Sequence, residues 1–425
     1  SAWLRTRRFW VQILAGAPQY MIKFGNKFFL IFIAAIFART FAIFFYGDTT
    51  IDKEWGAMIY SLESYGILSS RSVDGVPVPN LFMPPLYALF LYLIKTLIPD
   101  YNLFLNISLI IQLFLSIISI ILVYKIFLEL FNKNYSLIGA FVYSFFPLNI
   151  YAVSQISSIT LQMFLINIFI LSFIKVFKNI KKINSIFFAL SSALLILLRG
   201  EFFIFVLFSL FYLFLKIKNF WKILSISFLI ILLISPYIYR NYTIFGVLTV
   251  TKSTGFNLLK GNNPLSKVEG VPLFGVAGSV VPEVRTSIEE LKNKGPIVEH
   301  DLVKDQILLK QALQFIKENP SRYIKLYFQK FFSYLFIDIN SNYPNYYSLY
   351  HVVPKILLSI TAILGIILSI SLRFNVMNYF IIFYTANIGL FSLFFILPRY
   401  SLILLPIQLI LSIEGIKNLK RKLIN

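Results

Sequence analysis

The chain has 425 residues, of which 58% are hydrophobic and only 13% charged, with a mean hydropathy of +0.78 and a formal net charge of +21 at pH 7. Soluble chains carry about a quarter charged residues, so an ordinary soluble domain is excluded. Cysteine is absent and the only histidines are His300 and His351. Disulfide frameworks and thiolate metal sites are therefore excluded, and only two residues could serve as the histidine of a catalytic triad.

Apolar runs long enough to cross a hydrocarbon core of about 30 Å recur along the chain. They predict an all-α polytopic integral membrane protein with about 10 or 11 apolar segments, at residues 28–46, 81–98, 103–124, 136–153, 157–174, 183–198, 201–215, 223–239, 352–371, 377–397 and 399–418. The first run continues for a full span without a small-residue cleavage site, so we expect no cleavable signal peptide. Met21 is a candidate alternative start.

Basic residues gather between the apolar runs and near both ends of the sequence. The clusters are Arg5, Arg7, Arg8, Lys23 and Lys27; Lys175, Lys178, Lys181 and Lys182; Lys216, Lys218 and Lys222; and Lys417, Lys420, Arg421 and Lys422. This pattern is typical of cytoplasmic loops beside anionic lipid, and it argues against nucleic acid as the partner. We expect a multi-pass protein of the cytoplasmic (inner) membrane with both termini in the cytoplasm.

Two long polar stretches divide the chain into four regions. Residues 1–27 are a basic cytoplasmic N-terminus, 28–239 a transmembrane module with a first outer loop at 47–81, 240–350 a second extracytoplasmic loop, and 351–425 the C-terminal transmembrane helices with a basic tail. Alternation of sides places both loops on the outer face. Three apolar runs lie between the first loop and Ser154, where alternation requires an even number, so one of them is not a full span. The sequence does not show which.

Acidic residues follow the first span at Asp48, Asp52 and Glu54, before a predicted helix through Met58 and Leu62. The simplest interpretation of an isolated aspartate here is a helix cap. The position also suits catalysis, because a lipid headgroup and a water-borne substrate meet where the chain leaves the membrane.

Three short motifs carry a resemblance. The first combines these acidic residues with Pro84-Pro85-Leu86. The second runs from Ser235-Pro236-Tyr237 through Arg240-Asn241-Tyr242 and Phe245-Gly246 to Asn257-Leu258-Leu259-Lys260-Gly261-Asn262-Asn263-Pro264, and the third is Pro398-Arg399-Tyr400 leading into Leu404-Leu405-Pro406. Together they resemble the GT-C superfamily of membrane glycosyltransferases, in particular protein O-mannosyltransferases and aminoarabinose transferases.

The resemblance implies a first outer loop packed on a helical bundle, around a cavity that opens to the outer leaflet. It implies polyprenyl- or dolichyl-phosphate sugars as donors and an acidic general base after the first span. That role falls to Asp52, with Asp48 as the alternate. The family pattern has an acidic pair where this chain has Asp52-Lys53-Glu54, so Glu54 is the candidate for a second acidic role.

The chemistry of glycosyl transfer asks for similar groups. Inverting transfer needs a base for the acceptor hydroxyl and cations for the departing lipid phosphate. Arg199, Arg240 and Arg399 are the candidate donor-phosphate ligands. The alternatives are interfacial anchoring for Arg240 and Arg399, and a structural ion pair between Arg199 and Glu201. A divalent cation, Mg²⁺ or Mn²⁺, is also compatible with isolated carboxylates and a substrate phosphate.

The second loop offers further candidates. Asn262 and Asn263 are candidate sugar- or acceptor-binding amides, although a Gly-Asn-Asn-Pro turn is the simpler interpretation. A helix is predicted over 296–318, and residues 323–336 are expected to lie along the interface, with Lys325 and Lys330 reaching toward lipid phosphate.

The sequence thus favours a membrane glycosyltransferase that moves a sugar from a polyprenyl-phosphate donor to a hydroxyl of a protein, lipid or glycan. Two alternatives stay open. A transporter or flippase of lipid-linked sugars would tolerate the loss of Asp52. A polysaccharide ligase or phosphotransferase would instead use a pyrophosphate-linked donor.

Overall fold

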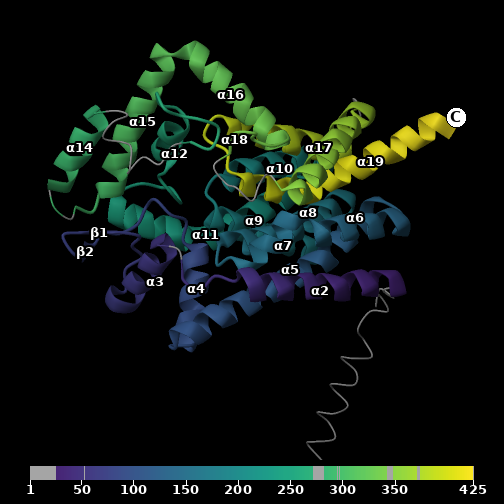
Figure 1. Ribbon diagram of the computed structural model, residues 1–425, viewed down its shortest axis with the longest axis horizontal. Helices are drawn as coiled ribbons and strands as arrows, with labels where there is room; N and C mark the ends of the chain where they lie inside the picture. Colours follow the sequence, from purple (N-terminus) through teal and green to yellow (C-terminus); the bar gives the residue numbers. More distant parts are fainter. Residues whose placement is uncertain are drawn as a thin grey trace, which may run out of the picture.

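The chain folds as an almost entirely helical bundle in the computed structural model, which describes residues 25–51, 53–270, 282–293, 295, 297–341, 348–370 and 374–424 (Figure 1). Its first half contains α2 (Asn26–Tyr46), α3 (Lys53–Tyr65), α4 (Leu86–Leu97), α5 (Tyr101–Leu130), α6 (Lys133–Phe145), α7 (Pro147–Ser154), α8 (Ser158–Lys178) and α9 (Lys182–Leu198). The second half contains α10 (Phe202–Ile217), α11 (Phe220–Phe245), α12 (Thr254–Gly261), α14 (Pro282–Asn293), α15 (His300–Glu318), α16 (Pro320–Leu335), α17 (Leu349–Ser369), α18 (Val376–Ser392), the 3₁₀ helix η2 (Pro398–Leu404) and α19 (Leu405–Ile424).

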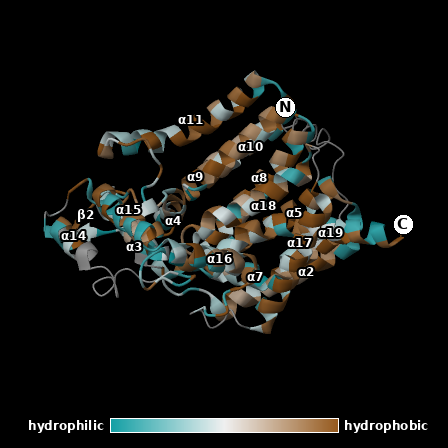
Figure 2. Ribbon diagram, turned by 90° about the horizontal axis from the view of Figure 1, so that it is seen from above, coloured by the Kyte–Doolittle hydropathy of each residue, from teal (hydrophilic) through white to brown (hydrophobic). Residues whose placement is uncertain are grey.

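The predicted polytopic all-α fold is confirmed. Among the described residues, six helices are long and apolar enough to cross a membrane, or seven if α6 and α7 form one bent span. The apolar helices α9, α10 and α18 are shorter. Figure 2 shows hydrophobic residues dominating the bundle helices, whereas hydrophilic residues gather on α14 and in the last turns of α19.

The bundle has two chemically different ends. At one end, here called the loop end, lie α3, α12, α14, α15 and a two-stranded hairpin, β1 (Ser72–Val73) and β2 (Val76–Pro77) (Figure 1). The opposite end carries the lysines that follow α8 and the basic last turns of α19, and is called the lysine end. The hairpin turns at Asp74 and Gly75, whose φ angles of 51° and 79° are those of a tight hairpin turn.

Helix α4 is the apolar run that is not a full span. Its 12 residues extend only about 18 Å at about 1.5 Å per residue, short of a hydrocarbon core. Figure 1 shows it lying across the direction of α2. The backbone N–H of Asp48 donates to the oxygen of Ser154 at 2.9 Å, which places the end of α7 beside the end of α2. Two crossings, α5 and the bent α6–α7 pair, therefore separate the first loop from Ser154.

The bend between α6 and α7 is 49° and has an identifiable cause. Pro147 has no N–H, so the oxygen of Tyr143 loses its helical partner, and the helix breaks there before the Ser144 oxygen gains one. The side-chain amide of Asn149 donates to the Tyr143 oxygen at 2.9 Å. The buried guanidinium of Arg39 on α2 donates to the Ser144 oxygen at 2.9 Å and also to Ser116 at 2.7 Å. Side chains thus satisfy backbone groups that neither water nor lipid can reach.

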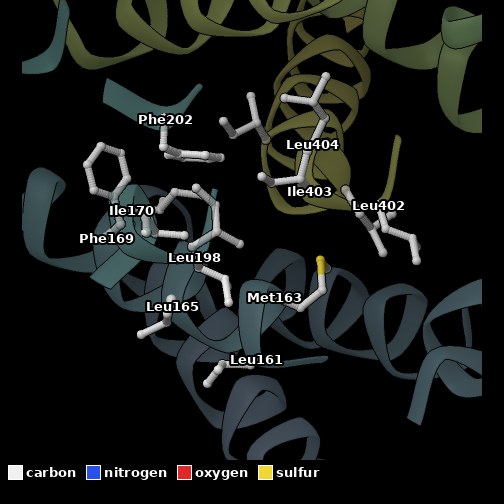
Figure 3. Packing of buried hydrophobic residues seen from close by; sticks show 14 of the residues in the cluster. Leu161, Met163, Leu165, Phe169, Ile170, Leu198, Phe202, Leu402, Ile403 and Leu404 are labelled. Carbon is white, nitrogen blue, oxygen red and sulfur yellow. The ribbon is translucent and has the colours of Figure 1, made fainter. Parts of the chain in front are cut away.

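Helix α8 forms the centre of the hydrophobic core. Leu161, Met163, Leu165, Phe169 and Ile170 of α8 pack beside Leu198, Phe202 and the η2 residues Leu402, Ile403 and Leu404 (Figure 3). Near the lysine end, the rings of Phe173 and Tyr379 stack with centroids 3.7 Å apart, joining α8 to α18. The core thereby fixes η2 and the α9–α10 turn, two elements that line the site described below.

The two long polar stretches pack on each other at the loop end. Arg71 forms an ion pair with the buried Asp301, whose Oδ2 accepts from the backbone N–H groups of Leu81 and Phe82 at 2.8 and 3.1 Å. The backbone N–H of Lys252 donates to the Leu81 oxygen at 2.7 Å. These contacts join the part of the first stretch that carries the hairpin to the second stretch.

The helices of the second stretch depart from the prediction. The helix expected over 296–318 begins only at His300, and Pro296 lies outside the described residues. The expected interfacial segment 323–336 is α16, with Lys325 exposed. Lys330 is fully buried and bonded to the chain, so the expectation that it reaches lipid phosphate is wrong.

Candidate functional site

A cavity of about 510 Å³ lies at the loop end of the bundle. The α9–α10 turn, α11, residues 248–257 and residues 390–400 surround it. Its apolar walls include Ile234, Ile238, Leu248 and Phe394, and its polar groups include Arg199, Glu201, Thr251, Asn257 and Tyr400. A mostly apolar cavity with a few converging polar groups is the usual form of a small-molecule site.

Arg199 supplies the positive charge of this cavity. It lies 3.2 Å from the Glu201 carboxylate, and its guanidinium is 5.2 Å from the centroid of the Tyr400 ring. Burial lowers the pKa of Arg199, but Glu201 and Tyr400 outweigh that effect and raise it above its ordinary value. The residue therefore stays cationic. The sequence prediction of an Arg199–Glu201 pair agrees with this geometry, and the pair faces a cavity.

A second charged group lies behind the same aromatic wall. The Lys260 ammonium is 4.3 Å from the Phe395 ring centroid and the Arg399 guanidinium 5.9 Å from that of Tyr400, and both rings line the cavity. Burial and the charge of Arg399 lower the pKa of Lys260, whereas Glu54 raises it. Two cations held near each other favour an anion between them.

The chain holds Lys260 and Arg399 together through the end of α12. Gly261 lies so close to the following segment that an added Cβ would be 1.9 Å from the Phe394 oxygen. The Asn262 amide donates to the Leu393 oxygen at 2.9 Å. The Lys330 Nζ donates to the Gly261 oxygen at 2.8 Å and to the Asn262 side-chain oxygen at 2.9 Å. Lys330 thus caps α12 and fixes it against the segment that leads to Arg399.

Asn262 and Asn263 are occupied by this packing. Both are fully buried. The Asn263 amide donates to the Leu259 oxygen at 2.8 Å, and its side-chain oxygen accepts from the Leu265 N–H at 2.9 Å. The turn interpretation therefore fits the geometry, and neither amide is presented to a sugar.

Arg240 does not line the cavity. Its guanidinium donates to the Asn80 oxygen at 2.9 Å and to the Asn241 side-chain oxygen at 2.7 Å, and lies 5.6 and 5.3 Å from the ring centroids of Tyr237 and Phe245. It joins the end of α11 to the first loop, so its contacts are those of an anchor. Among the three predicted arginines, only Arg199 and Arg399 are brought to the aromatic wall.

The acidic candidates lie at the start of the first loop. Asp52 lies outside the described residues. The Asp48 carboxylate accepts from the Ile156 N–H at 2.7 Å and is therefore fixed to the α7–α8 turn. Glu54, in the first turn of α3, is exposed and acts on Lys260 electrostatically. In the described part of the chain, no three acidic or histidine side chains converge as a metal site.

Sequence reasoning missed Lys260. The residue belongs to the Asn257–Pro264 motif, but that motif was used only for its resemblance. A lone lysine between Leu258-Leu259 and Gly261 was the available signal, because an apolar flank and a close-packing glycine predict a partly buried cation.

Solved structures of an archaeal membrane protein have the same architecture. The Archaeoglobus fulgidus oligosaccharyltransferase, tethered to an acceptor peptide containing the NVT sequon, gives a TM-score of 0.55 at 13% identity over 93% of this chain and 50% of that chain. Its complex with Zn and sulfate gives 0.55 at 13% identity over 92% and 49%. The present chain thus spans about half the length of the protein that it matches.

ArnT from Cupriavidus metallidurans gives a TM-score of 0.37 at 10% identity over 92% of this chain and 77% of that chain, too loose a likeness to carry an argument. No protein-family model and no curated protein sequence matches the chain. Over nearly its whole length, this chain shares the fold of the Archaeoglobus fulgidus oligosaccharyltransferase.

Proposed function

We propose that this chain is a membrane glycosyltransferase that transfers a sugar from a polyprenyl-phosphate donor to an acceptor hydroxyl at the loop end. The observation that carries the proposal is the 510 Å³ cavity, whose aromatic wall has Arg199 on one side and Lys260 and Arg399 close by. The fold shared with an archaeal oligosaccharyltransferase supports it. The loop end then faces the outside of the cytoplasmic membrane, and both termini face the cytoplasm.

In this proposal the cations stabilise the leaving group. The acceptor oxygen attacks the anomeric carbon, the bond from that carbon to the phosphate oxygen breaks, and the electron pair leaves with the polyprenyl phosphate. Lys260 and Arg399, with Arg199 across the wall, balance the charge that develops there. Glu201 already neutralises part of Arg199, so Lys260 and Arg399 carry most of the compensation. The polyprenyl chain occupies the apolar side of the cavity.

The acidic segment supplies the base. A carboxylate that accepts the acceptor's proton during attack from the face opposite the phosphate inverts the anomeric centre. We assign this role to Asp52, with Asp48 as the alternate and Glu54 as a second acidic group. Asp48 is already bonded to Ile156, and Glu54 lies in the field of Lys260, so each has a competing task. The acceptor is a hydroxyl on a protein, a lipid or a glycan.

The test uses purified full-length protein in detergent, a radiolabelled polyprenyl-phosphate monosaccharide and a native lipid extract as acceptor. Asp52→Asn is expected to lower transfer at least about a hundredfold, the scale of a lost general base. Glu63→Gln removes an exposed acid from the same loop and should leave transfer unchanged. Unchanged turnover in Asp52→Asn removes that residue from the chemistry. Absence of turnover with monophosphate and pyrophosphate donors alike contradicts the enzyme and favours a transporter.

A further inference from the structure

A second cavity, of about 410 Å³, lies at the lysine end of the bundle, away from the proposed donor cavity. One wall is the corner between α5 and α6, with Leu130, Phe131, Asn132 and Tyr135. The other wall is the last part of α19, with Lys417, Lys420, Arg421 and Ile424. Residues almost 300 positions apart in the sequence therefore form one hollow.

The charge of this hollow is strongly positive. Lys417, Lys420 and Arg421 line it, and no acidic residue does so in the part of the chain that the structure describes. Lys417 is held in place by Glu414 at 2.8 Å and by the Phe131 ring, whose centroid lies 5.5 Å from the ammonium. Lys420 and Arg421 are exposed and have no carboxylate partner within the described ranges. Two cations are thus left to bind an external anion.

The corner opposite these cations adds to the same field. Helix α6 begins there without an acidic residue in its first turn, and the side chain of Asn132 accepts from the Tyr135 N–H at 3.1 Å as its cap. The positive end of the helix therefore points toward the region of the three cations. The positive end of α6 adds to the attraction for an anion, but the three cations already define the site.

The surroundings show what kind of anion fits. Leu130, Phe131 and Ile424 give the hollow an apolar side, and Leu423 and Ile424 are 78% and 71% exposed on the last turns of α19. A free inorganic anion has no apolar surface that could pack against this side of the hollow. An amphiphile with a phosphate headgroup and acyl chains uses both halves of the hollow.

We propose that this hollow binds the phosphate headgroup of an anionic phospholipid, with Lys420 and Arg421 as its ligands and Lys417 as a fixed neighbouring charge. The site is separate from the donor cavity and does not depend on the proposed reaction. Its lipid joins the end of α19 to the α5–α6 corner, and so ties the last helix of the chain to the first half of the bundle.

The experiment measures lipid binding to detergent-solubilised full-length protein by native mass spectrometry, with phosphatidylglycerol and phosphatidylcholine as probes. The variant is Lys420→Gln with Arg421→Gln. The control is Lys181→Gln with Lys182→Gln, which removes two exposed charges from the lysine end without touching the hollow. We expect phosphatidylglycerol to bind more tightly than phosphatidylcholine. The hollow variant should weaken its binding about thirtyfold, on the scale known for two basic residues at a membrane surface, and the control should not.

Three outcomes overturn the proposal. Equal losses of phosphatidylglycerol binding in the two double variants mean that the lipid responds to the general surface charge of the lysine end and not to the hollow. Equal affinity for both lipids means that no headgroup site exists. Displacement of phosphatidylglycerol by millimolar inorganic phosphate alone means that the hollow binds free anions, with the apolar side playing no part.

Discussion

Replacing Lys330 by methionine removes a buried amine that joins α16 to the end of α12. The Lys330 Nζ donates to the Gly261 oxygen and to the Asn262 side-chain oxygen at 2.8 and 2.9 Å, and the residue has no exposed surface. A neutral amine has two N–H groups, which match these two acceptors. The deprotonated form therefore suits the site.

The pH dependence follows from the pKa of Lys330, which burial lowers from 10.5 to about 7. Each pKa unit corresponds to about 1.4 kcal/mol, so keeping the charge in the folded protein costs on the order of 5 kcal/mol. The folded chain releases this proton near pH 7 and the unfolded chain only near 10.5, so the unfolded state binds more protons between these values. The free energy of unfolding contributed by this group therefore rises with pH across that interval, and is constant below it.

The assay is thermal unfolding in a mild detergent from about pH 6 to about pH 9, with Lys325→Met as the control, because Lys325 is an exposed lysine on the same helix. Relative to Lys330→Met, the wild type and Lys325→Met should gain roughly 2–3 kcal/mol between about pH 7 and about pH 9. A wild-type advantage over Lys330→Met that stays constant over this range would refute the lowered pKa. A lysine that is charged and paired in the folded state would give this constant difference, because its titration would change the free energy of unfolding only near and above pH 10.5.

Two further substitutions test the packing and the charge of the site. Gly261→Ala places a Cβ 1.9 Å from the Phe394 oxygen, so it should lower the free energy of unfolding by about 2 kcal/mol or more. The control is Gly389→Ala, whose Cβ meets nothing closer than 3.5 Å. It should change the free energy of unfolding little in the same assay. Lys260→Gln should lower glycosyl transfer about a hundredfold, with Lys267→Gln, an exposed lysine of the same stretch, as the control; equal activity of the two variants would remove Lys260 from the site.

The helical membrane bundle could be predicted from the composition, because an apolar run of about 20 residues is seldom stable as anything other than a membrane-spanning helix. The failure of alternation in the first half was also visible in the sequence. The cause of this failure was not visible, because α4 differs from a membrane span only in length. The prediction also placed the start of this helix too early, before Pro84-Pro85 instead of after them. Length of a short helix is set by tertiary contacts as much as by hydropathy.

The candidate site was less accessible to sequence reasoning. A lone charge near an apolar run is energetically costly, and that argument singled out Arg199, which lines the cavity. It does not predict partners. Arg240 and Asn262 have the residue types of a binding site, but carbonyl oxygens of Asn80, Leu258 and Leu393 occupy them. Whether a polar side chain is already hydrogen-bonded in this way depends on contacts between distant segments, which no local sequence pattern predicts.

The bend at Pro147 has a consequence for how this chain can change over evolution. Helix α2 is hydrogen-bonded to the bend through Arg39, and the backbone of Asp48, just after α2, is hydrogen-bonded to Ser154 at the end of α7. A lineage that replaces Pro147 by a residue with an N–H regains a partner for the Tyr143 oxygen, straightens the helix and leaves Arg39 as a buried charge with fewer acceptors. Positions 39 and 147 should therefore vary together among homologous sequences.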